Sequence, residues 1–283
     1  MHRIYLRLLV LLGGCLGLPL CLAYVMGPDN RMPVVEAHHN DPGIRQTGMI
    51  RIHGEEFVSG LITGANCDVV ISAGHAAIYW QDLARKGWRR GEVRGQGRFR
   101  FSLSPRLDDS WENLHLIKSG YQDEGNIGKD EHDWSIFRSD KALTKNCEVP
   151  VIIRDTGSCH GGLVMPGFHF DKPFTRLLDN SCEIKQRNRK GIVVHNCDTK
   201  DGSSGAPLFC RVNDRLQLLG LNISGLTHRD YYDAGVFGQS GQAYDHRQHK
   251  NFAISVKGAF YRALMKELEA SSQRAKQHSG DKP

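Results

Sequence analysis

The sequence predicts an all-β protein made of antiparallel strands in a barrel or a sandwich. Short apolar segments recur between Gly-rich turn signals, and some alternate strictly, as in Arg98–Phe101. Short strands spaced in this way are typical of antiparallel barrels and sandwiches. Glycine supplies 31 of the 283 residues, more than its usual share, which indicates frequent turns. The chain has no heptads, no low-complexity repeat and no apolar run beyond the N-terminus, which excludes a coiled coil, a collagen, a polytopic membrane protein and a wholly disordered chain.

The amino-acid composition excludes few classes of function. The chain is 40% hydrophobic and 24% charged, as ordinary globular proteins are, and its length suits one large β domain or two fused halves. The net charge of +6 is mild and does not by itself indicate nucleic-acid binding.

Residues 1–23 are predicted to be an export signal. The apolar run from Leu8 to Met26 follows a basic start made of His2, Arg3 and Arg7, and Cys21–Ala23 offers small residues for cleavage. One alternative is an uncleaved membrane anchor, and another is a lipoprotein acylated at Cys15. Each places the rest of the chain outside the cytoplasm, either secreted or periplasmic, or anchored and facing the periplasm.

The cysteine count agrees with export. Beyond the signal the cysteines are Cys67, Cys147, Cys159, Cys182, Cys197 and Cys210. An even number in an exported protein suggests disulfides, and six cysteines allow fifteen pairings. No C-x-x-C pair is present, so we do not expect a zinc knuckle or a thioredoxin-like site.

Two groups of strand-like segments follow an arm at residues 24–47. The arm is polar and interrupted by Pro, Gly and Asn, so we expect it to be extended. The first group lies within residues 48–150, at Met49–Ile52, Leu61–Gly64, Val69–Ser72, Arg98–Phe101 and Trp134–Phe137. The second lies within residues 151–258, at Leu163–Met165, Ile192–Val194, Pro207–Phe209, Leu216–Ile223 and Phe252–Val256.

One helix is expected near the C-terminus, at residues 259–270. Its apolar face has helical spacing and consists of Phe260, Leu264, Met265 and Leu268. Residues 271–283 are polar and basic, and we expect them to be disordered.

The most specific chemical signal is Asp201–Leu208, which reads Asp-Gly-Ser-Ser-Gly-Ala-Pro-Leu. A nucleophilic serine needs a sharp turn that exposes its hydroxyl and directs backbone N–H groups at the developing oxyanion. Gly202 and Gly205 on either side of Ser204 permit such a backbone. An apolar strand begins at Pro207 and would fix the turn. The alternative is a plain Gly/Ser turn.

Two further segments complete a pattern with Ser204. Val70–Ala77 is a strand that runs into a small-residue corner carrying His75, and Asp133 stands at the head of an apolar strand. Either residue alone is more often structural. Serine acyl transfer, however, needs a base to take the hydroxyl proton and an acid to hold that base in the right tautomer. The order His, Asp, Ser therefore predicts a catalytic triad.

These three segments resemble the Ala-Ala-His, Asp-x-Ala and Gly-Asp-Ser-Gly-Gly-Pro motifs of trypsin-like, chymotrypsin-fold serine proteases. Gly27–Val34 is similar to the "G-x-D-x-R-x-x-V" start of the bacterial secreted branch related to glutamyl endopeptidases. His195–Thr199 also looks like a bacterial secreted variant. The resemblance covers roughly Gly27–Leu268.

The resemblance implies two antiparallel six-stranded β-barrels, at residues 48–150 and 151–258, with the active site between them. It implies an exported serine endopeptidase that hydrolyses peptide bonds through an acyl-enzyme and needs no cofactor. Ser204 would be the nucleophile and His75 the general base and then the general acid, while Asp133 would orient His75. The backbone N–H groups of Gly202 and Ser204 would form the oxyanion hole.

Ser203 departs from the family pattern. Zymogen-activated relatives carry an Asp there, which pairs with a freshly cut N-terminus and so builds the oxyanion hole. The chain also has no Arg-Ile-Val-Gly-Gly cleavage site. We therefore hypothesise that cleavage of the signal alone suffices.

Cleavage specificity has two competing interpretations. Asp198 lies six residues before Ser204, where trypsin-like enzymes place an acid that selects Arg or Lys side chains. Alternatively, Cys197–Thr199 is a structural disulfide turn. Glutamyl-specific relatives place a His where this chain has Asn222, which disfavours Glu specificity. We expect the pocket wall to include Asn222, Ser224 and Gly225.

The family bridges the positions of Cys159 and Cys210, so the resemblance implies this pair first. Cys182 and Cys197 flank an expected hairpin and form the second expected pair. Cys67 and Cys147 then remain as the third. Each bridge would contribute about 2–4 kcal/mol.

Two other signals favour a simpler interpretation. Arg85–Arg100 is rich in Arg and Lys, with glycines and aromatics between them, and an anionic partner such as nucleic acid, phospholipid or an acidic substrate would fit it. A solvated loop is the simpler interpretation. The histidines of the second half show no H-E-x-x-H or paired spacing, so no metal site is expected.

Two alternative functions stay open. The chain could be a non-catalytic protease-fold binding protein that uses Arg85–Arg100. It could instead be a narrow-specificity esterase or processing hydrolase. Covalent reactivity of Ser204 separates the enzyme from the binder, and a screen of protein substrates separates a general protease from a narrow hydrolase.

Overall fold

The structure is a computed structural model of the 283-residue chain. It describes residues 25, 28–53, 56–79, 92–93, 99–105, 111–122, 126, 129–153, 157, 159, 162–223 and 251–280. The predicted signal at residues 1–23, most of Arg85–Arg100, and the expected pocket residues Ser224 and Gly225 lie outside this part.

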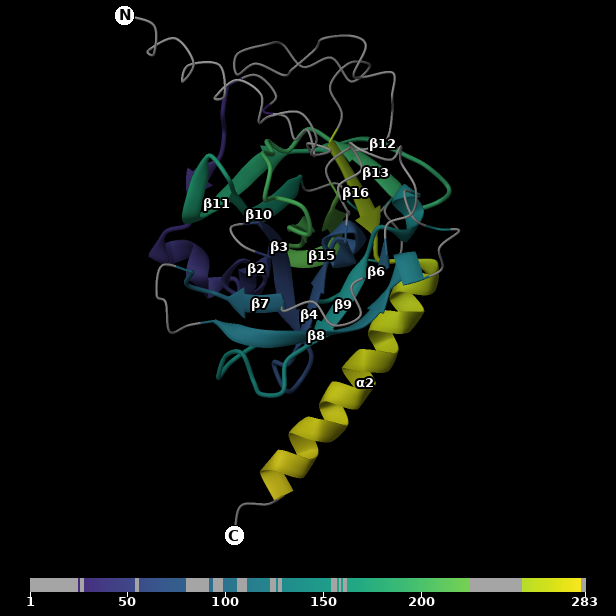
Figure 1. The fold of residues 1–283 in the computed structure, drawn as a ribbon. Helices are drawn as coiled ribbons and strands as arrows, with labels where there is room; N and C mark the ends of the chain where they lie inside the picture. The colour runs from purple at the N-terminus through teal and green to yellow at the C-terminus, as the bar shows by residue number, and fades with distance from the viewer. Residues whose placement is uncertain are drawn as a thin grey trace, which may run out of the picture.

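A closed barrel of antiparallel strands forms the first half, in the order β2-β3-β4-β9-β8-β7 (Figure 1). Its strands are β2 (Thr47–His53), β3 (Glu56–Thr63), β4 (Val69–Ser72), β7 (Phe99–Ser102), β8 (Glu112–Ser119) and β9 (Ser135–Arg138). Alternate residues of a barrel strand point inward, and here they fill one apolar core that includes Ile50, Ile62, Val70, Phe99 and Phe137. A small sheet of β5 (Ile78–Tyr79) and β6 (Glu92–Val93) accompanies this barrel.

The second half forms one curled sheet in the order β1-β11-β10-β14-β15-β16-β13-β12. Its strands are β1 (Met32–Pro33), β10 (Leu163–His169), β11 (Lys172–Cys182), β12 (Ile184–Arg187), β13 (Ile192–His195), β14 (Pro207–Val212), β15 (Arg215–Asn222) and β16 (Asn251–Ser255). Only Glu183 separates β11 from β12, yet the two lie toward opposite ends of the sheet. The sheet must therefore curl back on itself, and the chain bend at Glu183 joins its two sides.

The predicted fold class is confirmed, with one difference in the second barrel. If β11 and β12 are taken as one bent strand, β10 to β16 supply six strands. Among the described residues, no ladder of hydrogen bonds joins β11 to β12, so this barrel is a curled sheet rather than a fully bonded cylinder.

The N-terminal arm is extended only in part. β1 pairs with β11, but the short helices η1 (Glu36–Asn40) and α1 (Pro42–Arg45) follow it. The Asp41 side chain accepts the N–H of Gly43, and Pro42 occupies the first helical position, where its missing N–H costs nothing. This Asp-Pro start corrects the expectation that the whole of residues 24–47 is extended.

The C-terminal helix α2 (Gly258–Gly280) runs past the expected end at residue 270 and projects beyond the barrels in Figure 1. Ser271 is buried and donates its hydroxyl to Asp68 Oδ1 at 2.6 Å, while Arg274 Nε donates to Asp68 Oδ2 at 2.6 Å. These charge-assisted bonds fix the helix to the loop between β3 and β4. They correct the expected disordered tail for residues 271–280.

Three disulfides staple the fold, and they are the three expected pairs: Cys67–Cys147, Cys159–Cys210 and Cys182–Cys197. The first packs against the core of the first barrel, and the other two pack in the core of the second. No helix within the described part of the chain is long and apolar enough to cross a membrane.

Candidate active site

His75 and Asp133 meet at the ends of two paired strands. β4 and β9 run side by side to the pair Ser72–Ser135, so the turn after β4 and the segment before β9 leave the barrel together. His75 Nδ1 lies 2.9 Å from Asp133 Oδ2, and the His75 backbone N–H donates to Asp133 Oδ1 at 2.8 Å. Both side chains are buried. A carboxylate accepts hydrogen bonds, so Nδ1 is the donor of this pair and Nε2 is the nitrogen left for another partner.

The backbone of this corner is too tight for a side chain. A Cβ on Gly74 would lie 2.6 Å from the backbone nitrogen of Trp134. Only glycine allows the His75 turn to approach the Asp133–Trp134 backbone this closely.

Ser204 lies in the loop between β13 and β14, which packs against the first barrel. Gly202 and Gly205 on either side of it have φ values of +93° and +78°, the left-handed region that glycine adopts without strain. A Cβ on Gly205 would lie 2.1 Å from Ser72 Oγ, and 2.9 Å from the backbone nitrogen of Ala73, two residues before His75. The serine loop and the histidine turn are therefore neighbours across the barrel interface.

Ser59 on β3 joins the two barrels at this point. Its backbone N–H donates to the carbonyl of Ser204 at 2.8 Å, and its hydroxyl donates to the carbonyl of Gly202 at 3.0 Å. The same hydroxyl accepts the N–H of Phe168 on β10 at 2.9 Å. Nothing in the sequence singled out Ser59, because a polar residue in an apolar strand is a weak signal.

The N–H groups of the serine loop fall into two classes. Those of Ser203, Gly205 and Ala206 donate to backbone carbonyls. Within the described part of the chain, the N–H groups of Gly202 and Ser204 donate to no backbone acceptor. Fixed donors with no backbone acceptor, next to a serine hydroxyl, are the kind of groups that can stabilise an oxyanion.

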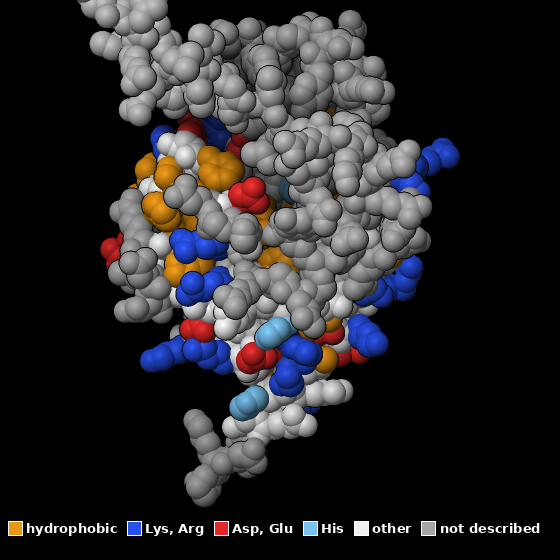
Figure 2. Space-filling model, in the orientation of Figure 1, with side chains coloured by type: hydrophobic (Ala, Val, Ile, Leu, Met, Phe, Trp, Pro, Cys, Tyr) orange, Lys and Arg blue, Asp and Glu red, His pale blue; other side chains and the backbone are white. Residues whose placement is uncertain are grey.

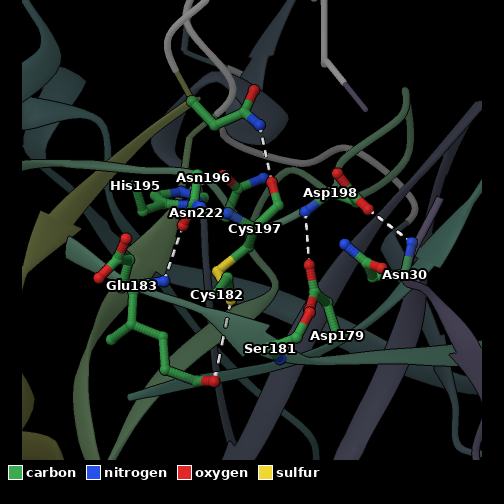
Figure 3. The surroundings of a disulfide bond; sticks show 12 residues. Asn30, Asp179, Ser181, Cys182, Glu183, His195, Asn196, Cys197, Asp198 and Asn222 are labelled. Carbon is green, nitrogen blue, oxygen red and sulfur yellow. Dashed lines mark hydrogen bonds between the residues drawn. A yellow bond between two sulfur atoms is a disulfide. The ribbon is translucent and has the colours of Figure 1, made fainter. Parts of the chain in front are cut away.

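The N-terminal arm covers Asp198. This residue is fully buried, and its Oδ2 accepts the backbone N–H of Asn30 at 2.7 Å. Its own N–H donates to Asp179 Oδ2 at 2.7 Å, and Figure 3 shows both bonds next to the Cys182–Cys197 disulfide. The carboxylate expected at a pocket floor is thus in contact with the protein's own arm.

Arg31 anchors the same arm one residue further on. Its buried guanidinium binds Asp29 Oδ1 at 2.9 Å and Asp171 Oδ2 at 2.6 Å. The hydrogen bond from Arg31 lowers the pKa of Asp29 to about 2. Phe170, beside Asp171, donates its N–H to the carbonyl of Asp201 at 2.7 Å. The arm therefore supports the serine loop directly at residue 198 and through the β10–β11 turn at residue 201.

Asn222, expected in the pocket wall, ends β15 with its side chain buried and turned toward His195 and Ser203. Sequence reasoning missed both contacts. The described residues contain no cluster of three or more His, Cys, Asp or Glu side chains able to hold a metal ion. On the face shown in Figure 2, the described Lys and Arg side chains are spread out with Asp and Glu between them.

Comparison with known proteins identifies the fold. No protein-family model matches the sequence, and no curated protein matches it. A solved Glu endopeptidase matches with 16% identity over 87% of this chain and 99% of that chain, at a TM-score of 0.60.

Two more solved structures agree with the first. The serine endoprotease from Yersinia pestis has 15% identity over 84% of this chain and 67% of that one, at a TM-score of 0.50. The thermostable serine protease AL20 from an extremophilic microorganism has 16% identity over 81% and 98%, at a TM-score of 0.51. At these identities the likeness shows the fold, which is that of chymotrypsin-like serine proteases.

Proposed function

We propose that this chain is an exported serine endopeptidase that cleaves peptide bonds with the triad His75, Asp133 and Ser204. The observation that carries the proposal is the buried His75–Asp133 pair at 2.9 Å, set at the strand ends against which the Ser204 loop packs. The similar solved serine proteases support it. The three disulfides support an oxidising compartment, either periplasmic or extracellular.

Each residue has one task in the proposed reaction. Ser204 Oγ attacks the scissile carbonyl carbon while His75 Nε2 takes its proton, and Asp133 stabilises the imidazolium. The carbonyl oxygen becomes an oxyanion that the N–H groups of Gly202 and Ser204 stabilise. The intermediate then collapses to an ester on Ser204, and the leaving amine takes the proton from His75. Water, deprotonated by His75, attacks the ester carbon, the bond to Ser204 Oγ breaks, and His75 returns the proton to Ser204 Oγ as the second product leaves.

The arm contact bears on specificity. Because the N–H of Asn30 already bonds to Asp198, we assign Asp198 to holding the arm rather than to binding a cationic substrate side chain. A peptide library should then show no strong preference for Arg or Lys before the cleaved bond. A preference of about tenfold or more, roughly 1.4 kcal/mol, would restore the pocket-floor interpretation.

Covalent labelling of the purified, signal-free protein with a fluorophosphonate tests the proposal. We expect labelling of the wild type, its loss in Ser204→Ala and His75→Ala, and its persistence in the control Ser272→Ala, whose hydroxyl donates to the carbonyl of Leu268 within α2. A folded, oxidised wild type that is not labelled would contradict the enzyme and favour the binding protein. Labelling without cleavage of any protein substrate would favour the narrow hydrolase.

A further inference from the structure

Ser203, the residue before the proposed nucleophile, is held by a buried side-chain amide. Asn222 Nδ2 donates to the carbonyl of Ser203 at 3.1 Å and lies 3.1 Å from the Ser203 hydroxyl oxygen. Both residues are fully buried. An ionic contact is what builds the oxyanion hole in zymogen-activated relatives, whereas the contact at this position here is neutral.

Asn222 also holds the other side of Ser204 through its backbone. Its carbonyl accepts the N–H of Gly205 at 2.6 Å, and its own N–H donates to the carbonyl of Ala206 at 2.8 Å. One residue of β15 thus bonds to the residues before and after the nucleophile. Its side chain acts on one flank and its main chain on the other.

His195 fixes the direction of the Asn222 amide. The backbone N–H of Cys197 donates to His195 Nδ1 at 3.2 Å, so this nitrogen is unprotonated and the other ring nitrogen carries the proton. His195 Nε2 therefore donates to Asn222 Oδ1, 3.1 Å away, which leaves the amide nitrogen to face Ser203. Burial lowers the pKa of His195 to about 4, so the ring is neutral at neutral pH.

We infer that Asn222 is a positioning residue of the nucleophile loop rather than a wall of the specificity pocket, and that His195 orients it. This inference rests on the proposed function, because it assigns the support for the same serine. The support is made of neutral groups that are all present in the folded chain. It needs no new N-terminal amino group to form.

The variant Asn222→Asp tests the inference at constant shape. It keeps an oxygen for His195, removes the amide donor and brings an acceptor oxygen against the carbonyl of Ser203. We expect kcat and the fluorophosphonate labelling rate to fall by on the order of 10²-fold, as when an oxyanion-hole donor is lost, with little change in KM. A pocket wall would instead change KM and the ranking of peptide substrates.

Gln46→Glu is the matched control. Gln46 is also a buried side-chain amide, but it lies directly before β2 in the first barrel and donates to the carbonyls of Ile62 at 2.8 Å and Glu148 at 2.9 Å. We expect it to lose stability while its folded fraction keeps its kcat. Equal kcat losses in the two variants, or a change only in KM for Asn222→Asp, would overturn the inference.

Two substitutions of His195 test the inference if Asn222→Asp does not fold. His195→Gln retains an N–H donor that can reach Asn222 Oδ1, and His195→Leu does not. We expect the Gln variant to retain clearly more labelling than the Leu variant. Equal labelling in the two would contradict the orienting role.

Hydrogen exchange separates this inference from the proposed function. In Asn222→Asp the amides of residues 202–206 should exchange faster, and in Gln46→Glu they should not. This readout does not depend on catalysis, so it judges the inference even if the wild type is never labelled. Unchanged exchange in Asn222→Asp would overturn it.

Discussion

The two barrels support their parts of the candidate site by different means. In the first, His75 and Asp133 follow directly on paired strands, so the ladder between β4 and β9 places both. In the second barrel, Ser204 lies in the loop between β13 and β14, outside the paired strands. Buried side chains hold that loop instead, among them Asp198, Asn222 and the hydroxyl of Ser59. Backbone that leaves a ladder must find other partners, and here specific side chains join backbone carbonyls in that role.

The difference teaches where substitutions should act. In the first barrel, a substitution that breaks the single contact between His75 and Asp133 should be enough to abolish the proposed catalysis. A change in the second should act through several partial supports, each with a smaller effect.

The largest effect is expected from Asp133→Asn. The amide would favour the wrong tautomer of His75, so the kcat of the proposed peptidase reaction should fall by about 10⁴-fold with KM nearly unchanged. Asp140→Asn is the control, because Asp140 also bonds to a histidine, His115 at 3.0 Å, but in an exposed pair. Similar kcat values for the two variants would contradict the role given to Asp133.

The disulfides offer a direct comparison between the barrels. Cys67–Cys147 spans 80 residues and Cys182–Cys197 spans 15. In the chain-entropy model their removal by Cys→Ser changes should lower the free energy of unfolding by about 4.5 and about 3 kcal/mol respectively.

The order should reverse for activity measured on the folded protein. Cys197 precedes Asp198 and its N–H fixes His195, so loss of its bridge should slow labelling of Ser204 more than loss of Cys67–Cys147. Denaturant unfolding and the labelling rate measure the two effects. If both variants lost activity in proportion to stability, the second bridge would have no local role.

The arm should have a moderate effect. Asn30→Pro removes the N–H that bonds to the Asp198 carboxylate, while Asn30→Ala keeps it. A hydrogen bond to a charged group is worth about 1.5–3 kcal/mol, so labelling of Ser204 should slow by about tenfold or more in the Pro variant only. Equal rates in the two variants would show that the arm does not support the loop.

A pH dependence of stability is also expected from the second barrel. Burial lowers the pKa of His169 to about 3 and that of His195 to about 4, against 6.5 for a free histidine. The unfolded chain therefore binds protons that the folded chain does not between about pH 6.5 and pH 4. Stability is full above this window and falls as the pH falls through it, by up to about 1.4 kcal/mol per pH unit for each histidine.

Urea unfolding from pH 7 to pH 4 measures this slope. In His195→Gln, the difference in bound protons between the unfolded and the folded chain should fall by about one. The free energy of unfolding should then depend less steeply on pH. The same slope in the variant and the wild type would show that His195 titrates normally in the fold.

The sequence predicted the parts of the site that follow local rules. His75, Asp133 and Ser204 each lie in a short segment with its own pattern of strand, glycine and small residue. The supports could not be read in this way, because their partners are far apart in the chain: Asn222 and His195 by 27 residues, Asn30 and Asp198 by 168.

The errors have the same origin. Residues 271–280 are polar, and composition alone predicts disorder there. A buried Asp68 more than 200 residues earlier supplies the partners that make them helical, at separations of 203 and 206. In the arm, by contrast, the Asp41-Pro42 start was local and could have indicated a helix.

The C-terminal helix also sets an order of events in biogenesis. Phe260 stacks on Trp134 with ring centres 5.1 Å apart, directly beside the proposed catalytic acid, and Arg274 bonds to Asp68. These contacts belong to the first barrel, yet they are made by α2, which follows the strands of the second barrel in the sequence. During synthesis the first barrel therefore lacks these contacts until α2 has left the ribosome. Such long-range closure is slow compared with local strand pairing. The surroundings of the candidate site would thus be completed only after both barrels and α2 had been synthesised.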